Sequence, residues 1–289
     1  MNKTAHRYCG RDFTAEELET VGHIIADHPK HNRAHISRLV CQALGWYKPD
    51  GSLKDMSCRV ALLRMQEDGL LTLPKPQHDQ KIRRPRIPLT DATAPKPCID
   101  APVQALCDLH LDLVADSKDS NLWREYIHRY HYLGYTPLPG AQLRYTARAN
   151  GDVVALLGFG AAAWTTAARD SFIGWTHEQR QKNLHLVVNN ARFLVLPWIK
   201  SKNLASKLLS MAAKRLGDDW QTHYGYRPVL IETFVETGSF RGTCYKSANW
   251  ICVGQTKGRG KLLNSPILPK KDIWLYPLTP AFRDALCCS

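Results

Sequence analysis

Apolar side chains in the first seventy residues recur at the three- and four-residue intervals that place them on one face of a helix. Three segments have this pattern: residues 14–28, 33–44 and 53–69. The first opens with Thr14 and Glu17 at the spacing of a capping box. An apolar run at residues 70–74 then predicts a short strand. Three helices followed by a strand predict a winged helix-turn-helix domain over residues 1–74.

The third of these helices is the one that a winged helix places in the major groove of DNA. We expect its apolar residues Met56, Val60 and Leu63 to face the core. Basic and polar side chains remain for DNA, where they suit phosphates and guanine edges. They are Lys54, Asp55, Ser57 and Arg59. The alternative is a winged helix that binds protein.

Residues 75–102 are rich in proline and in basic side chains, which is typical of a linker. We expect its charges to follow the DNA backbone as a wing or an arm. These charges include Lys81, Arg83, Arg84 and Arg86. The linker would join the first domain to a second one at residues 103–289.

The second domain alternates strand and helix patterns. Asn150 and Gly151 lie between two apolar runs, and this dipeptide favours the tight turn of a β-hairpin. Later strands are predicted at residues 186–198, 227–236 and 251–260, and helices at residues 203–216 and 242–250. The order predicts an α/β fold with a mixed, mainly antiparallel sheet and flanking helices.

The chain of 289 residues has 39 Lys and Arg against 26 Asp and Glu, a formal net charge of +13. Such an excess attracts polyanions, so we expect DNA as a partner. No apolar stretch reaches the ~20 residues needed to span a bilayer, and the start has no secretory signal pattern. These features predict a cytoplasmic protein with no membrane partner. Nine cysteines without a C-x-x-C pair predict free thiols and no structural zinc site.

One stretch concentrates the positive charge. Residues 241–271 contain seven Lys or Arg and no Asp or Glu. We expect four of these cations to contact phosphates: Lys246, Lys257, Arg259 and Lys261. Tyr245 and Trp250 could offer faces on which unpaired bases stack. The alternative is a solvated basic turn beside two core aromatics.

Carboxylates form a second group of candidates. Glu232 and Glu236 are four apart on a predicted strand and therefore share a face. Other acids that the fold could bring to them are Asp170, Asp218 and Asp219. Clustered carboxylates would hold Mg²⁺ for phosphodiester cleavage. The alternative is that they are surface groups or partners of nearby arginines, and we assign no metal ligand.

Some polar residues lie among apolar or aromatic neighbours. His131 is a candidate general base, because the ordinary pKa of histidine is near 6.5, or else a packed histidine. Asn189, Asn190 and Arg192 open a strand that should be buried, so they need partners. Those partners are either backbone hydrogen bonds or a ligand.

Two motifs of the second domain resemble the GNAT acyltransferases, which implies a GNAT-like fold. Residues 200–205, Lys-Ser-Lys-Asn-Leu-Ala, are similar to the turn that holds the pyrophosphate of acetyl-CoA in that family. Asn203 stands where the family has its first glycine, and we expect its side chain to obstruct a phosphate. Tyr245 matches the family's tyrosine in Tyr-x-x-x-Gly-Phe, which implies a general acid, while Asn249 replaces the glycine.

A series of motifs across nearly the whole chain resembles the DruA family of Druantia anti-phage systems. They include RDSFIGW, NARFLVLPW, LIETFVE and FRGTCYKSANW, in this order. The resemblance implies a role in defence against phage or mobile DNA, with other defence proteins as partners. A DNA-binding protein, for duplex DNA and an unpaired strand, is the function we favour. The alternatives are a metal-dependent nuclease or transposase-like enzyme and an acyl-CoA-dependent N-acyltransferase. Candidate catalytic residues for these are Glu232, Asp170, Tyr245 and His131.

Overall fold

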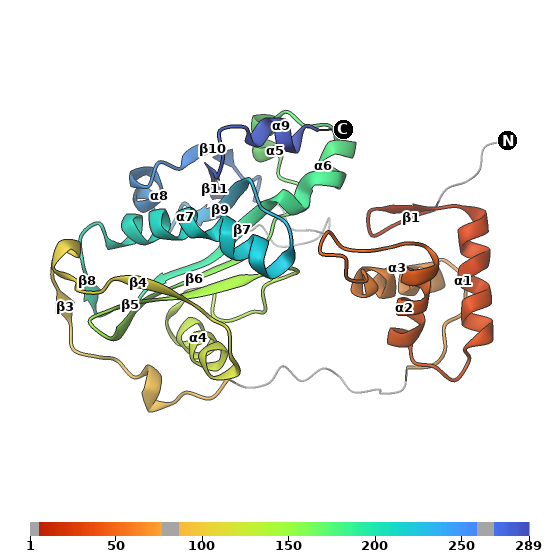
Figure 1. Cartoon of the computed structure of the whole chain (residues 1–289), viewed down its shortest axis with the longest axis horizontal. Helices are drawn as coiled ribbons and strands as arrows, with labels where there is room; N and C mark the ends of the chain where they lie inside the picture. The colour runs from red at the N-terminus through yellow and green to blue at the C-terminus, as the bar shows by residue number, and fades with distance from the viewer. Residues whose placement is uncertain (1–5, 77–86, 259–268, 289) are drawn as a thin grey trace. The chain divides into compact units, whose positions relative to one another are not determined.

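The computed structural model describes residues 6–76, 87–258 and 269–288. The chain divides into two compact units, Met1–Pro85 and Arg86–Ser289 (Figure 1). Each unit has a hydrophobic core of its own. Within the described ranges, no helix combines the length and the apolar character of a membrane span.

The first unit consists of a β-hairpin and three helices. Its elements are β1 (His6–Tyr8), β2 (Arg11–Phe13), α1 (Ala15–Asp27), α2 (Arg33–Ala43) and α3 (Asp55–Glu67). The three helices confirm the helical predictions. The capping box is also confirmed, because the Thr14 and Glu17 side chains each accept a hydrogen bond from the other's backbone N–H.

The strand expected at residues 70–74 is not formed, and that prediction is wrong. The backbone groups of this segment bond to side chains instead of to a neighbouring strand. The Leu73 backbone N–H donates to Gln66 Oε1 at 2.9 Å, and Arg33 Nε donates to the Pro74 carbonyl at 2.8 Å. The strands of the unit precede the helices, so the described residues have three helices without the strand that would mark a wing.

The buried face of α3 also differs from the prediction. Met56 and Val60, expected in the core, are 61% and 40% exposed. The buried residues are Cys58, Ala61, Leu62 and Met65. Both sides of this helix carry apolar residues, so periodicity alone could not choose between them. The side with Cys58 and Ala61 is buried, since small side chains allow closer packing of helices.

The second unit is built on a seven-stranded sheet in the order β10-β11-β9-β7-β6-β5-β4. The strands are β4 (His110–Leu113), β5 (Leu143–Ala149), β6 (Asp152–Ala161), β7 (Val187–Val195), β9 (Leu230–Glu236), β10 (Ile251–Gln255) and β11 (Lys271–Pro277). Among the described strands of this seven-stranded sheet, β7 and β9 pair in parallel and the other neighbours pair antiparallel. The mixed, mainly antiparallel sheet is therefore confirmed. So is the β5–β6 hairpin, where Asn150 and Gly151 both have positive φ.

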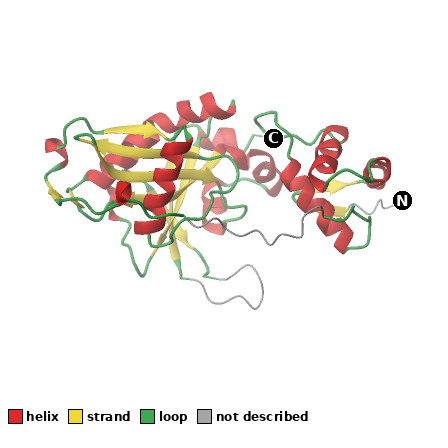
Figure 2. Ribbon diagram, turned by 90° about the horizontal axis from the view of Figure 1, so that it is seen from below, coloured by secondary structure: helices red, strands yellow, loops and turns green. Residues whose placement is uncertain are grey.

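Helices cover both faces of this sheet (Figure 2). They are α4 (Ser117–Tyr130), α5 (Ala167–Ile173), α6 (His177–Asn183), α7 (Leu204–Tyr224), α8 (Thr243–Ser247) and α9 (Phe282–Leu286). Neighbouring residues of β5 show that α4 and α7 lie on opposite faces (Figure 1). Arg144 Nη1 donates to Ser120 of α4, and the Tyr145 hydroxyl donates to Asp219 of α7.

Part of the segment read as a linker belongs to the second unit. Glu125 of α4 accepts hydrogen bonds from the Thr90 and Thr93 hydroxyls, at 3.1 Å and 2.6 Å. The short strand β3 (Ile99–Asp100) pairs with β8 (Ile199–Lys200). The composition of residues 75–102 did not reveal these contacts, because they are made by threonines and two strand residues that any loop could contain.

Two glycines of β6 provide a test of how closely α4 packs on the sheet. A Cβ at position 158 would lie 2.9 Å from the Trp123 ring and 3.2 Å from Leu138, whereas one at position 160 would meet Leu138 at 3.4 Å. Gly158→Ala should therefore lower the free energy of unfolding by about 1–3 kcal/mol. Gly160→Ala is the matched control, and urea unfolding should show a much smaller change. Equal effects of the two substitutions would contradict this packing.

Candidate functional site

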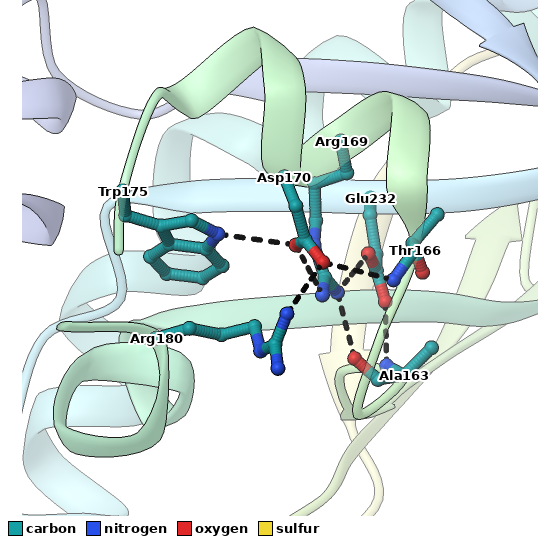
Figure 3. A network of polar contacts seen from close by, with 7 residues as sticks. All are labelled: Ala163, Thr166, Arg169, Asp170, Trp175, Arg180 and Glu232. Carbon is teal, nitrogen blue, oxygen red and sulfur yellow. Dashed lines mark hydrogen bonds and ion pairs between the residues drawn. The ribbon is translucent and has the colours of Figure 1, made fainter. Parts of the chain in front are cut away.

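Glu232, a predicted catalytic carboxylate, lies in the middle of the second unit. It is fully buried on β9. Its Oε2 accepts from Arg169 Nη1 at 2.7 Å, and its Oε1 accepts from the Ala163 backbone N–H at 2.7 Å (Figure 3). Burial raises the pKa of Glu232, and the charge of Arg169 opposes that rise. Arg169 is itself fully buried, so the two charges depend on each other.

Asp170 joins the same network from the start of α5. Its Oδ1 accepts from Arg169 and from Trp175 Nε1, and its Oδ2 accepts from Arg180 at 3.1 Å and from the Thr166 backbone N–H at 3.2 Å (Figure 3). The structure thus brings Asp170 and Glu232 together, as the sequence analysis considered. It does so around arginines, so every carboxylate oxygen already has a donor.

The remaining acids do not join this network. Asp219 pairs with Arg215 at 2.6 Å, and Asp218 pairs with Arg227. Over the described part of the chain, no three or more His, Cys, Asp or Glu side chains are arranged to hold a metal ion. Asp170, Glu232 and their arginine partners thus form a buried ion cluster that attaches α5 to the sheet.

Tyr245 is placed where β7 and β9 separate. These strands pair only through Val187–Asn189 and Leu230–Glu232. Beyond that point the Tyr245 hydroxyl donates to Asn190 Oδ1 at 3.2 Å, and Thr233 Oγ1 donates to the Asn190 carbonyl at 2.9 Å. Burial raises the pKa of Tyr245, so its phenol stays protonated. Its proton reaches a ligand only if the bond to Asn190 breaks.

A polar cleft of about 470 Å³ opens beside the start of α7. Its lining includes Gln104, Asn203, Ser206, Lys207, Ser210 and Asn249. The N–H groups at the start of a helix favour anions, and Lys207 adds a full positive charge. Neither residues 187–217 nor residues 237–271 contain an acid. The cleft is therefore suited to a phosphate-bearing group.

Both asparagines that replace family glycines adopt the left-handed backbone conformation. Asn203 has φ 67 and Asn249 has φ 62. Asparagine accepts this conformation better than other residues with a side chain. The chain path at these turns is thus one that glycine would take, and Asn203 makes no side-chain bond to the cap of α7. The substitutions preserve the backbone of the turn and add an amide at the cleft.

His131 follows α4 and is 9% exposed. Its Nδ1 accepts from the Leu133 backbone N–H at 3.2 Å, and its ring stacks on that of Tyr132 with centroids 4.9 Å apart. Burial, together with the positive charge of Arg192, lowers the pKa of His131 to about 4. The ring is neutral near pH 7, as a base requires, but it is a weak base.

The predicted DNA-contacting residues are placed as follows. Lys54 is the N-cap of α3 and is half-buried, as is Ser57, while Arg59 pairs with Asp55 at 3.3 Å. Lys246 and Lys257 are exposed. The others lie outside the described residues: Lys81, Arg83, Arg84, Arg86, Arg259 and Lys261.

The expected stacking faces are buried, which corrects that hypothesis. Tyr245 and Trp250 are 8% and 5% exposed, with ring centroids 5.1 Å apart in an edge-on contact. Their rings fill the core, so neither can receive a base. Exposed aromatic rings occur elsewhere, at Tyr132 and Phe240, and no sequence pattern distinguished these two from core residues.

The family described as Druantia protein DruA matches residues 64–280. The chain belongs to the DruA family. The match begins within α3 and covers most of the second unit, so most of the first unit of this DruA-family chain lies outside it. Among curated proteins, none matches the sequence.

Several solved N-acetyltransferases are similar to the second unit in outline. Spermidine/spermine N-acetyltransferase SpeG from Vibrio cholerae is 12% identical with a TM-score of 0.39, covering 59% of this chain and 92% of that one. The aminoglycoside acetyltransferase AAC(6')-Ib in complex with coenzyme A is 17% identical with a TM-score of 0.38, covering 58% and 95%. An N-acetyltransferase from Staphylococcus aureus Mu50 is 9% identical with a TM-score of 0.36, covering 59% and 97%. Likeness of this degree says nothing about activity.

Removing one partner of the buried ion cluster should be costly. Glu232→Ala leaves Arg169 with an uncompensated part of its charge, and we expect the free energy of unfolding to fall by about 3–5 kcal/mol. Glu236→Ala, on the same strand and face but half-buried, should cost less than about 1 kcal/mol. Urea unfolding measures both. Millimolar Mg²⁺ should stabilise neither the natural chain nor the variants, and specific stabilisation by Mg²⁺ would contradict a purely structural cluster.

The lowered pKa of His131 leads to a second prediction, on the pH dependence of stability. An unfolded histidine titrates near 6.5, so between pH 6.5 and about 4 the unfolded chain binds a proton that the folded chain does not. Stability should therefore fall as the pH is lowered through this window. NMR of the ring protons should show a midpoint near 4, and Arg192→Gln should move it upward. A midpoint near 6.5 in the natural chain would show that the ring is not buried as described.

Proposed function

We propose that this DruA-family chain is a DNA-binding protein of prokaryotic anti-phage defence or mobile-element biology. In this proposal α3 of the first unit enters the major groove of duplex DNA. The observation that carries it is the exposed side of α3. There Met56 and Val60 stand in solvent, and Arg64 lies one turn beyond Val60 and is also exposed.

The composition of this exposed side suits base edges. Positions 56, 60 and 64 follow one another at four-residue intervals and thus lie on one stripe of the helix. Apolar side chains contact the thymine methyl group, and arginine bonds to guanine. Lys54 at the start of the helix suits a phosphate. Met56 and Val60 are exposed one turn apart, so this side of the helix offers apolar as well as basic contacts to a partner.

The positive charge of the second unit also favours DNA as the partner. Residues 86–289 carry 25 Lys or Arg against 16 Asp or Glu, and residues 1–85 carry 14 against 10. Most of the excess therefore lies outside the helical unit. A second contact of the large unit with DNA phosphates would add affinity without sequence preference.

Fluorescence anisotropy with a labelled duplex tests the proposal. Affinity should fall linearly with the logarithm of salt concentration, through counterion release. Arg64→Ala should weaken binding and reduce the salt slope by about one if Arg64 meets a phosphate, or relax sequence preference if it meets a base. Val60→Glu should weaken binding at least about ten-fold.

The matched control for these variants is Arg7→Ala in the same unit. Arg7 already pairs with Asp12 at 3.0 Å, so its loss should change duplex affinity little. Duplex binding that is absent at low salt, or that Arg64→Ala and Val60→Glu leave unchanged, would overturn the role of α3.

A second candidate is an N-acyltransferase that uses acetyl-CoA, and the conformation of Asn203 favours it. Since Asn203 keeps the left-handed turn, the N–H groups at the start of α7 remain open to a phosphate. Lys207 and Ser206 would hold the phosphates, and the thioester would supply the acyl group. Calorimetry with acetyl-CoA tests this. Heat that Lys207→Glu abolishes supports it, and no heat at millimolar ligand removes it.

A further inference from the structure

Arg192 on β7 is a buried cation held only by neutral groups. It is 9% exposed. Its Nη2 donates to Thr136 Oγ1 at 2.6 Å and its Nη1 to the Ala191 carbonyl at 2.7 Å, while its Nε is buried without an acceptor. Within residues 6–76, 87–258 and 269–288, no carboxylate lies within 4 Å of its guanidinium. A buried arginine of this kind is costly unless an anion joins it.

The guanidinium lies near the surface. Thr136, whose hydroxyl accepts from Arg192 Nη2, is exposed, so this bond links the buried guanidinium to a residue at the surface. The nearby acid is Glu236, which acts on the pKa of Tyr132 and accepts from Ser239 Oγ at 3.1 Å. The buried His131 is neutral near pH 7, so it adds no second positive charge.

The segment that bonds to this arginine also carries one of two exposed aromatic rings that contact each other. Tyr132 is 49% exposed and Phe240 is 47% exposed, and their ring centroids are 5.1 Å apart. The 2.6 Å bond from Arg192 Nη2 to Thr136 places the guanidinium at the segment that follows α4, and Tyr132 lies on that same segment, four residues before Thr136. Phe240 opens a stretch without acids that continues with the exposed Arg241. A flat apolar face and a cation without an anion thus occur together.

The same face of the sheet offers one more unsatisfied group. On β6, Gly158 and Gly160 point to one face, and they pair with Arg192 and Asn189 respectively. Asn189 Oδ1 is buried and has no donor. A ligand at Arg192 would therefore find a hydrogen-bond acceptor on the same face.

We propose that Arg192 and the Tyr132–Phe240 pair bind a nucleotide unit of an unpaired DNA strand, with the phosphate at Arg192 and the base on the two rings. The inference rests on the proposed function in that DNA is taken as the ligand, but it concerns a different surface and a different form of DNA. Unpaired bases offer a free face for stacking, whereas bases inside a duplex do not. A guanidinium matches a phosphate in shape and charge.

Phe240 provides the sharpest test, because it is exposed and its replacement should not disturb folding. Phe240→Leu keeps an apolar side chain but removes the ring, and Phe240→Trp keeps a ring. With the full chain and a labelled oligothymidine, anisotropy should show about ten-fold weaker binding for Phe240→Leu and near-natural binding for Phe240→Trp. Ile251→Ala, at a residue 42% exposed on β10, is the control and should bind as the natural chain does.

Arg192→Lys tests the phosphate contact. Lysine keeps the charge but lacks the fork, so single-strand affinity should fall several-fold, and a melting curve checks that the variant is folded. If this variant is unfolded, an oligothymidine with one uncharged methylphosphonate linkage replaces it. That oligonucleotide should bind the natural chain more weakly than the charged one.

Comparison with a duplex separates this inference from the proposed function. Loss of single-strand binding in Phe240→Leu, with duplex binding unchanged, supports the inference. If Phe240→Leu and Phe240→Trp bind the single strand equally well, the inference is overturned and the role of α3 is untouched. The same conclusion follows if Phe240→Leu loses duplex and single-strand binding to an equal degree. Thymidine monophosphate provides the last arm. If the free nucleotide binds and Phe240→Leu abolishes that binding while the oligonucleotide fails to bind, the surface takes a free nucleotide and the unpaired strand is excluded.

Discussion

The separation of strands β7 and β9 determines the hydrogen bonding at the centre of the second unit. The two strands share only three paired positions, and backbone groups that lose their partners inside a sheet must find others. On one face, Thr233 bonds to the Asn190 carbonyl while Tyr245 bonds to the Asn190 side chain. The polar residue Asn190 in a largely apolar strand is therefore explained by the geometry of the sheet.

Two buried arginines of the second unit differ in how their positive charges are compensated. Arg169 is surrounded by carboxylate oxygens of Asp170 and Glu232, so its charge is compensated within the fold. Arg192 bonds only to a hydroxyl and a carbonyl. The first arrangement stabilises the attachment of α5 and leaves no oxygen for a metal. The second leaves positive charge uncompensated, which is the condition under which binding an anion lowers the free energy most.

The sequence carried enough information for the main elements. Capping at Thr14, the Asn150-Gly151 turn and the strand patterns of the second unit depend on local chemistry, and local chemistry is readable from residues. The buried side of α3 was not readable, because both sides of that helix carry apolar residues and only the packing of α2 decides between them. The missing strand at residues 70–74 has a similar cause, since its backbone bonds to the side chains of Gln66, on the preceding helix, and Arg33, 41 residues earlier, and an apolar pattern does not show such bonds.

For the candidate sites, too, the sequence indicated individual residues more readily than contacts between separate elements. Sequence reasoning named Asp170 and Glu232, considered Arg169 as a partner of the acids and identified Arg192 as a residue in need of partners, and the structure pairs Arg169 with both acids. It did not find Arg180, because that contact joins separate elements. It considered Tyr245 and Trp250 either as stacking faces or as core aromatics, and the structure places both in the core, while Tyr132 and Phe240 are among the exposed rings. Whether an aromatic ring is exposed depends on the tertiary fold, and aromatic spacing does not encode it.

The asparagines at positions 203 and 249 have a consequence for what the cleft can bind. Each takes a backbone shape usually reserved for glycine, and asparagine has fewer conformations than glycine in the unfolded chain, so less entropy is lost when the turn forms. Each also brings one acceptor and two donors to the rim of the cleft. A turn built with glycine would offer a ligand only its main chain, whereas these two turns also offer side-chain amides that can discriminate between ligands.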